Sequence, residues 1–562
     1  MDGQNFVQKH LAEETERRTR WKVLISTDAR RVVRVLTAAG CSPETIDGDT
    51  WWDIPSILNC LQDPSKSPQS AVWRRLVRAG LITALCKCSI KMQMWTLLPD
   101  NAPPPTEEEK KARIKELPSP WYEPLAIICT AAVGCAMPPT DTEKQIFEEI
   151  KQDWTAIVQR IYSEPVNSLD QEPYSVLERA IIAQIALRMS SLDPTFFDVI
   201  FKPTDMTLAV CFRSWVYATA REDTVLNNSL ILSIFGSSTF VSPWRDYFAA
   251  YPAPSDSELI RRLIQGASMG VAEHKKLTPP QAARTIVAAF AKHLTLPGLT
   301  FSEVLQEVEF LKTFGAVARK EFPAFSPAVC RSEALWAALP RVVRRAVDEP
   351  RAEGRGVVSD VLIMYGKMIQ TVVNDGPETH ADALVHCWVA GGLFDMLEEH
   401  LVRIMNLPDG CMALTLMLNT IDMSIPYLST KTRAELRAQL PRTGMVWKIL
   451  KAGIASGENE DVAQYKRNIA GFFLAKGLPD PRNPVWRQGA WETLAALGHK
   501  MRSPAPAHGT ARGDAEHREM CSKGWFAVAE ESSRSFMEAE SMGLEEPSGM
   551  PDMASLQVED ID

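Results

Sequence analysis

Residues 76–85 read LVRAGLITAL, and residues 388–397 read WVAGGLFDML. In each stretch an apolar helix end meets a glycine, Gly80 or Gly392, and a second apolar helix follows at once. Glycine has no Cβ, so it adopts the left-handed conformation that closes a helix end without a steric clash. A helix that stops at glycine and restarts directly is typical of the corner between two stacked helices. The two stretches therefore predict helical units that pack side by side.

Apolar residues elsewhere in the chain recur at the three- and four-residue spacing of a helix face. They include the stripe of Trp154, Ile157, Val158 and Ile161, the apolar run 177–187, the stripe of Leu305, Val308, Leu311 and Phe314, and the segment 445–450. Convincing alternating strands next to Asn-Gly or Asp-Gly turns are absent from the sequence. The pattern predicts an all-α protein.

Proline-rich breaks divide the chain at intervals of about 20 to 60 residues, which suits units of two or three helices. We therefore predict an α-solenoid of divergent armadillo-like or HEAT-like helical repeats over residues 1–500. An irregular helical bundle remains the alternative, because no strict repeat consensus aligns. Helix starts are marked as well, for example by Ser255-Asp256-Ser257-Glu258, where cap and acidic residues favour the positive end of a helix.

Two segments have the composition of unfolded chain. Residues 98–120 are rich in proline, glutamate and lysine and predict a flexible loop. Residues 501–562 lack apolar periodicity, and within them residues 530–562 hold ten acids against one base, Arg534. Such a segment buries too little apolar surface to offset the entropy of ordering, so we predict a disordered acidic tail.

The bulk composition limits the function classes. A chain of 562 residues exceeds the size of one compact core. Its net charge of −9 disfavours general nucleic-acid binding. The N-terminus has no secretory pattern, and the longest uncharged apolar stretch, 125–137, is shorter than the ~20 residues that span a bilayer, so it predicts a buried helix. Eleven scattered cysteines indicate reduced thiols. We expect a cytoplasmic or nuclear protein that is neither secreted nor transmembrane.

The strongest catalytic motif is Gly266-Ala267-Ser268-Met269-Gly270, which matches the G-x-S-x-G turn that presents the nucleophile of α/β-hydrolases. That turn follows a buried strand, whereas residues 257–265 carry two adjacent arginines at helical spacing. We therefore interpret the motif as the end of a helix with small residues at a close packing contact. A serine hydrolase with Ser268 as nucleophile stays as an alternative function.

No metal-ligand pattern emerges from the histidines and cysteines. The spacings among His380, His386, Cys387 and His400 match no standard zinc site, and Cys86 and Cys88 point to different sides of a helix. We expect no catalytic, cofactor-binding or metal-binding residues and no cofactor.

Tryptophans and arginines offer candidate contacts with partner proteins. The pairs Trp51-Trp52 and Trp486/Trp491 have the character of interface anchors, although core packing is commoner. The basic clusters Arg74-Arg75, 341–345 and Arg433 with Arg437 suit a groove for an acidic partner, with solvated helix faces as the alternative.

Residues 516–521 read EHREMC, which resembles the C-terminal segment of a MYND zinc finger. The resemblance implies that His517 and Cys521, four residues apart on a helix, would face one zinc ion. The chain resembles fungal armadillo-like helical proteins that end in such a finger. The resemblance implies a truncated finger here, because residues 501–515 contain none of the six further cysteines of that family. A MYND-type regulator with a degenerate finger is therefore a further alternative.

Taken together, these patterns predict a non-enzymatic protein–protein interaction scaffold or adaptor that binds other proteins along a helical-repeat surface. This prediction follows from the architecture, since stacked repeats expose long surfaces.

Overall fold

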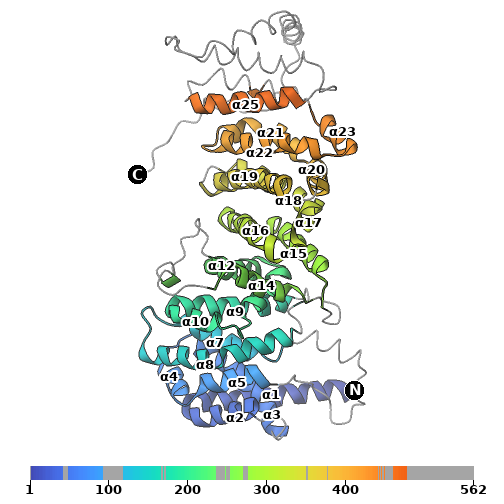
Figure 1. Cartoon of the computed structure of the whole chain (residues 1–562). Coiled ribbons are helices and arrows are strands. Elements are labelled where there is room, and N and C mark those ends of the chain that lie inside the picture. Colours follow the sequence, from blue (N-terminus) through green and yellow to red (C-terminus); the bar gives the residue numbers. More distant parts are fainter. Residues whose placement is uncertain are drawn as a thin grey trace, which may run out of the picture. The chain divides into compact units, whose positions relative to one another are not determined.

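The computed structural model describes most of the chain between residues 2 and 476. The described residues are 2–41, 48–92, 118–165, 169, 173–235, 247–248, 254–269, 276–349, 352–375, 378–440, 442, 445, 448–449 and 460–476. In this part of the chain the regular structure is helical and contains no strand, which confirms the predicted all-α class (Figure 1). The tail 501–562 and all but the last three residues of the predicted loop 98–120 lie outside it.

The chain divides into two compact units. Unit 1 comprises Met1–Met396 with Pro426–Leu428, and unit 2 comprises Leu397–Ile425 with Ser429–Asp562, so the boundary falls inside helix α21. Unit 1 holds α1 (Asp2–Thr27), α2 (Ala29–Cys41), α3 (Gly48–Ser65), α4 (Ala71–Arg78), α5 (Leu81–Lys91), α7 (Tyr122–Gly134), α8 (Asp141–Ser163), α9 (Pro173–Leu192), α10 (Phe197–Ile200), α11 (Thr207–Val216), α12 (Arg221–Phe235), α14 (Asp256–Ala267), α15 (Pro279–Leu294), α16 (Phe301–Glu321), α17 (Phe325–Cys330), α18 (Glu333–Val347), α19 (Ala352–Asp375) and α20 (Glu378–Ala390). Helix α21 (Leu393–Met405) is followed in unit 2 by α22 (Gly410–Ser424), α23 (Thr430–Ala438) and α25 (Glu460–Lys476).

Packing within unit 1 joins helices that are a few positions apart along the chain. Helix α2 packs on α5, α5 on α8, α8 on α11 and α11 on α14. A second series runs from α3 to α7, α9 and α12. Each helix of these two series thus packs on a helix two to four labels further on, which Figure 1 shows as successive layers.

Polar caps fix where the helices begin. Helices α8 and α16 each start with a capping box, in which Thr140 pairs with Glu143 and Thr300 pairs with Glu303. The predicted start at Ser255 is confirmed, since its hydroxyl accepts a hydrogen bond of 3.3 Å from the backbone N–H of Glu258. These bonds satisfy N–H groups that have no partner inside their own helix.

Both glycine corners of the sequence take the predicted conformation. Gly80 has φ of 94° between α4 and α5, and Gly392 has φ of 80° between α20 and α21. The backbone N–H of Gly80 donates to the carbonyl oxygen of Val77 at 2.9 Å, so the corner also closes the end of α4. A residue with a Cβ would be strained at either position.

Large aromatic residues and apolar helices form the interior. Seven tryptophans have less than 2 % of their surface exposed: Trp21, Trp73, Trp121, Trp154, Trp215, Trp336 and Trp388. The apolar stretch 125–137 supplies most of α7, whose Leu125, Ile128 and Ala131 are fully buried, as predicted. Leu177 departs from the expected apolar run of α9, because its side chain is 53 % exposed.

One helix in the described part of the chain has the length and composition to cross a membrane. It is the segment 353–373 of α19, and half of its apolar window is buried against other helices. Core helices pass the same test, and α19 packs on α16, α18 and α20. The described helices therefore give no indication of a protein with several membrane spans.

Candidate interaction surfaces

The G-x-S-x-G motif lies at the end of a helix. Helix α14 runs to Ala267, and the hydroxyl of Ser268 donates to the carbonyl oxygen of Ile264 at 2.8 Å. Gly266 packs against α11 so closely that a Cβ there would lie 2.0 Å from the carbonyl oxygen of Ala209. The motif thus serves as a helix-packing contact, as the sequence indicated, and no strand precedes Ser268 in residues 254–267.

Of the histidines and cysteines of the sequence analysis, His400 and Cys86, Cys88 and Cys387 are buried, whereas His380 and His386 are half-buried. No group of three or more His, Cys, Asp or Glu side chains lies close enough to hold a metal ion among the described residues. The ten described cysteines are free. Burial raises the pKa of Cys88 and of Cys129 to about 12, so both are thiols at neutral pH and are weak nucleophiles. His517 and Cys521 lie outside the described residues.

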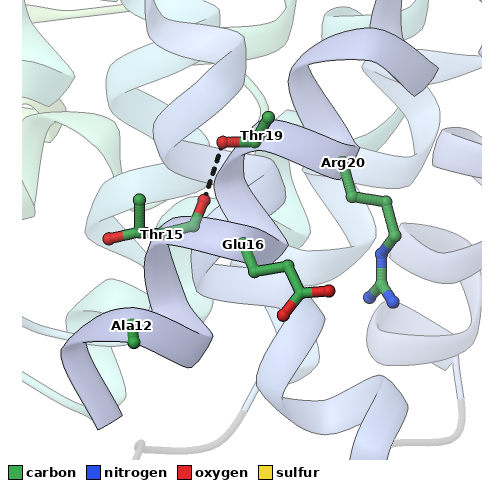
Figure 2. Close-up of a pocket in the computed structure, with 5 residues that line it drawn as sticks. All are labelled: Ala12, Thr15, Glu16, Thr19 and Arg20. Carbon is green, nitrogen blue, oxygen red and sulfur yellow. Dashed lines mark hydrogen bonds between the residues drawn. The ribbon is translucent and has the colours of Figure 1, made fainter. Parts of the chain in front are cut away.

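A shallow depression of about 840 Å³ follows one face of α1 (Figure 2). Its lining comes from Ala12, Thr15, Glu16, Thr19 and Arg20, one turn apart along a single helix. The hydroxyl of Thr19 donates to the carbonyl oxygen of Thr15 at 2.8 Å, and the side chains of Glu16 and Arg20 extend beside it. A hollow formed by one helix encloses no ligand, so we regard it as part of an open surface.

Several arginines turn inward and close the ends of neighbouring helices. Arg160 donates to the carbonyl oxygen of Ser89 at the end of α5, and Arg188 donates to that of Ala132 at the end of α7. Arg213 and Arg262 do the same for the ends of α8 and α10, through Ile161 and Ile200. The last carbonyl groups of a helix have no partner inside it and carry partial negative charge, so a guanidinium stabilises them. Burial lowers the pKa of Arg213 to about 10.

A buried ion pair joins α9 to α12. The Nε atom of Arg179 donates to a carboxylate oxygen of Asp223 at 2.7 Å, and neither side chain is exposed. Asp223 also accepts hydrogen bonds from the backbone N–H groups of Thr219 and Ala220 at 3.1 and 2.9 Å. One carboxylate thus caps α12 and neutralises a buried guanidinium.

A second polar cluster lies among aromatic rings between α11, α12, α15 and α16. Glu307, 1 % exposed, accepts hydrogen bonds from the indole N–H of Trp215 at 3.2 Å and from the side-chain amide of Asn228 at 2.8 Å. The fully buried ring of His293 lies 3.7 Å from the other carboxylate oxygen, and neither of its nitrogens forms a hydrogen bond. The cluster is enclosed and offers no access to a substrate.

Exposed basic residues lie on two helices near the N-terminus, α2 and α4, which contact each other. Between residues 17 and 34 the chain has seven bases and one acid, and α4 adds three arginines and no acid. On α2 and α4, the exposed arginine side chains for which the described structure shows neither an ion pair nor a hydrogen bond are Arg30, Arg31, Arg34, Arg74 and Arg78. We call these five side chains the basic face.

The helices behind the basic face are firmly held. The other side of α4 is buried and consists of Trp73, Leu76 and Val77. The buried side of α2 includes Val32, Val33 and Leu36. Arg75 ties α4 to the corner between α1 and α2, because it donates to the carbonyl oxygen of Ser26 at 2.7 Å. The guanidinium of Arg31 lies 6.0 Å from the centre of the Trp21 ring at the same corner. Buried contacts therefore hold the backbone that carries the basic face, while its arginine side chains are exposed.

The other predicted basic clusters have structural contacts of their own. Arg345 stands over the ring of Phe301 at 5.8 Å, while Arg341 is exposed on α18. In unit 2, Arg433 donates to the carbonyl oxygen of Ile425 at 3.1 Å, which closes the end of α22. The structure thus separates arginines that cap helices from those that face solvent, a distinction that the sequence pattern did not contain.

An apolar stripe is exposed on α22. Met412, Leu416 and Met423 share one face of the helix and are 43, 36 and 50 % exposed. The opposite face packs on α25. Of the tryptophan pairs, Trp52 is half-buried beside Arg17, at 5.9 Å from the guanidinium, and Trp486 and Trp491 lie outside the described residues.

In a comparison with known proteins, no protein-family model, curated protein or solved structure matches the chain.

Proposed function

We propose that this protein is a non-enzymatic protein–protein interaction scaffold and that its basic face docks an acidic segment of a partner protein. In this proposal the helices up to about residue 500 form an α-solenoid of divergent armadillo-like or HEAT-like repeats. The recurring packing step of unit 1, from α2 to α5, α8, α11 and α14, supports the repeat character. Repeats of this kind expose extended surfaces that suit peptide binding.

The observation that carries the proposal is the free positive charge of the basic face. Arg30 and Arg34 are one helical turn apart on α2, and Arg74 and Arg78 are one turn apart on α4. All four are exposed and unpaired, although the whole chain has a net charge of −9. A guanidinium presents a planar fork of donors that binds carboxylates in a bidentate manner, so closely spaced carboxylates of a partner suit these pairs.

The charge balance favours a protein partner over nucleic acid. Residues 1–92 hold 14 bases and 10 acids, a net charge of only +4, and the remaining residues are acidic. A net charge this small is too weak for the extended positive surface with which a general nucleic-acid binder contacts the phosphate backbone. A short acidic peptide needs only a local patch.

A titration with a defined acidic probe tests this proposal. We expect the full chain to bind a fluorescent poly-L-glutamate of about 20 residues, read by anisotropy at low salt. The variant Arg30→Glu/Arg34→Glu should bind about tenfold more weakly or worse, because two attractions become repulsions. The control Arg284→Glu/Arg355→Glu changes the net charge equally at exposed arginines of α15 and α19 and should bind normally. Equal affinity of both variants would remove the basic face as the binding site.

A further inference from the structure

Three helices of unit 1 begin with a serine or threonine that is followed three residues later by glutamate. These pairs are Thr140 with Glu143 at α8, Ser255 with Glu258 at α14 and Thr300 with Glu303 at α16. Such a spacing starts a helix when the glutamate closes a capping box. A hydroxyl residue followed by acids is also the acceptor pattern of protein kinases that select acidic substrates. The contacts of each glutamate distinguish the two roles.

The glutamates of α8 and α16 are engaged by their own helix starts. Glu143 is fully buried and accepts a hydrogen bond of 2.7 Å from the backbone N–H of Thr140. The side chain of Glu303 is only 11 % exposed and accepts one of 2.8 Å from the backbone N–H of Thr300. A carboxylate that closes a capping box is not available to an approaching enzyme, so Thr140 and Thr300 serve as helix caps.

The start of α14 leaves its acids accessible. Glu258 forms an ion pair with Arg262 one turn further on instead of a capping box, and its side chain is still 37 % exposed. Asp256, directly after Ser255, is exposed and forms no ion pair within the described part of the chain. Carboxylates one and three residues after the hydroxyl group therefore face solvent at this helix.

The hydroxyl group of Ser255 is itself accessible. Ser255 is exposed, and its hydroxyl accepts one hydrogen bond of 3.3 Å, from the backbone N–H of Glu258, and donates none to the described residues. Its backbone is extended, with φ of −60° and ψ of 150°, and α14 begins only at the next residue. The first turn of a helix opens locally at small cost, so the residues after Ser255 can follow it into the active site of an enzyme.

We propose that Ser255 is phosphorylated by an acid-directed protein kinase that recognises Asp256 and Glu258. The Oγ atom of Ser255 attacks the γ-phosphorus of ATP, the bond from that phosphorus to the bridging oxygen of the departing ADP breaks, and the hydroxyl proton passes to the catalytic base of the kinase. The two carboxylates suit arginine and lysine side chains of the enzyme. The inference is independent of the basic face, which lies on α2 and α4.

A phosphate at Ser255 strengthens the start of α14. It adds nearly two negative charges at neutral pH and three acceptor oxygens, next to first-turn N–H groups that have no partner inside the helix. The positive end of the helix dipole favours this charge. Because α14 packs on α11 and α16, the modification stabilises a helix in the middle of the packing series of unit 1.

Phosphorylation of the folded full-length chain tests the proposal. The chain is incubated with ATP and casein kinase, an acid-directed kinase, and the tryptic peptide 246–261 is analysed by mass spectrometry. We expect phosphate at Ser255 and none at Thr140 or Thr300. The variant Ser255→Asn keeps a helix cap and should leave this peptide unmodified. The variant Asp256→Asn/Glu258→Gln should react about tenfold more slowly or worse, because the enzyme loses both carboxylates. The control Glu333→Gln/Glu353→Gln removes two exposed charges elsewhere and should react at the normal rate.

Several outcomes would overturn the inference. These are absence of phosphate from peptide 246–261, phosphate at Ser257 in place of Ser255, and equal rates for the unaltered chain and Asp256→Asn/Glu258→Gln. Modification that appears only after denaturation would do the same, because the folded helix start would then hide the hydroxyl. Hydrogen exchange reports the structural effect: the backbone N–H groups of Ser257 and Glu258 should exchange roughly threefold more slowly in the phosphorylated chain. Faster exchange there would contradict the stabilising role of the phosphate.

Discussion

Gly266 of α14 lies directly against the backbone of Ala209 in α11, where a Cβ would come within 2.0 Å of the carbonyl oxygen and 2.8 Å of the carbonyl carbon. Only glycine allows the two helices to approach this closely. The contact explains why a small residue stands at this point of the motif, and it links two successive members of the packing series of unit 1.

Replacement of this glycine should separate the two helices. We expect Gly266→Ala to lower the free energy of unfolding by about 1–3 kcal/mol, because backbone atoms on the facing helix cannot move aside. Gly315→Ala is the matched control in α16, since a Cβ there would meet only Phe325 at an ordinary 3.8 Å. The control should gain about 0.5–1 kcal/mol from better helix propensity. Denaturant titrations followed by circular dichroism give both values, and equal shifts would refute the packing argument.

The buried ion pair should respond strongly to loss of one partner. Asp223→Ala leaves the guanidinium of Arg179 unpaired in the interior and removes the cap of α12, so we expect a loss of about 3–5 kcal/mol. Lys144→Ala breaks the exposed pair with Asp141 and should cost less than about 1 kcal/mol. Thermal unfolding of the two variants under one condition makes the comparison. A small effect at Asp223 would mean that water reaches this pair.

Asp205 should make stability depend on pH. Burial raises its pKa to about 6, against the opposing effects of hydrogen bonds from Thr207 and Thr155 and of the Arg262 charge. Between pH ~4 and ~6 this carboxyl is therefore protonated in the folded state but ionised in the unfolded chain. The carboxyl's contribution to the free energy of unfolding is therefore full at the acidic end of this window. It falls by up to about 3 kcal/mol as the pH rises through the window.

The variant Asp205→Asn isolates this effect. Its side chain cannot ionise, so the difference in free energy of unfolding between variant and unaltered chain should shift in favour of the variant as the pH rises from ~4 to ~7. Other titrating groups cancel in this difference. Parallel stability curves for the two proteins would show that the carboxyl is ordinarily solvated.

The two halves of the basic face should act together. Arg74→Glu/Arg78→Glu on α4 is expected to weaken binding of the acidic probe by about tenfold, as the α2 variant does. Combining the α2 and α4 changes should give less than the product of the two effects, because a single bound peptide contacts both helices. A fully multiplicative loss would indicate two independent sites.

Much of the local structure was predictable from the sequence. Glycine at residues 80 and 392 closes helices because no other residue adopts that conformation without strain. The stripe from Trp154 to Ile161 is buried on one face of α8, since its apolar residues recur at the helical period. The cap at Ser255 followed from its hydroxyl and the acids behind it.

The role of each arginine was not predictable, because it depends on which helix ends lie next to it. Arg261 and Arg262 are neighbours in the sequence, yet Arg261 is exposed and Arg262 closes the end of α10. His293 and Glu307 lie 14 residues apart in the sequence, on α15 and α16, and only the packing of these helices brings them together. Contacts of this kind require knowledge of the stacking order, which the pattern of a single helix does not contain.

Salt dependence tests the central claim most directly. Charge on the basic face, rather than apolar surface, is proposed to hold the acidic ligand, so the dissociation constant of the poly-L-glutamate probe should rise more than about tenfold between ~50 and ~500 mM salt. The variant Arg30→Glu/Arg34→Glu should show a much smaller change. A dissociation constant that stays constant across this range for the unaltered chain would contradict the account.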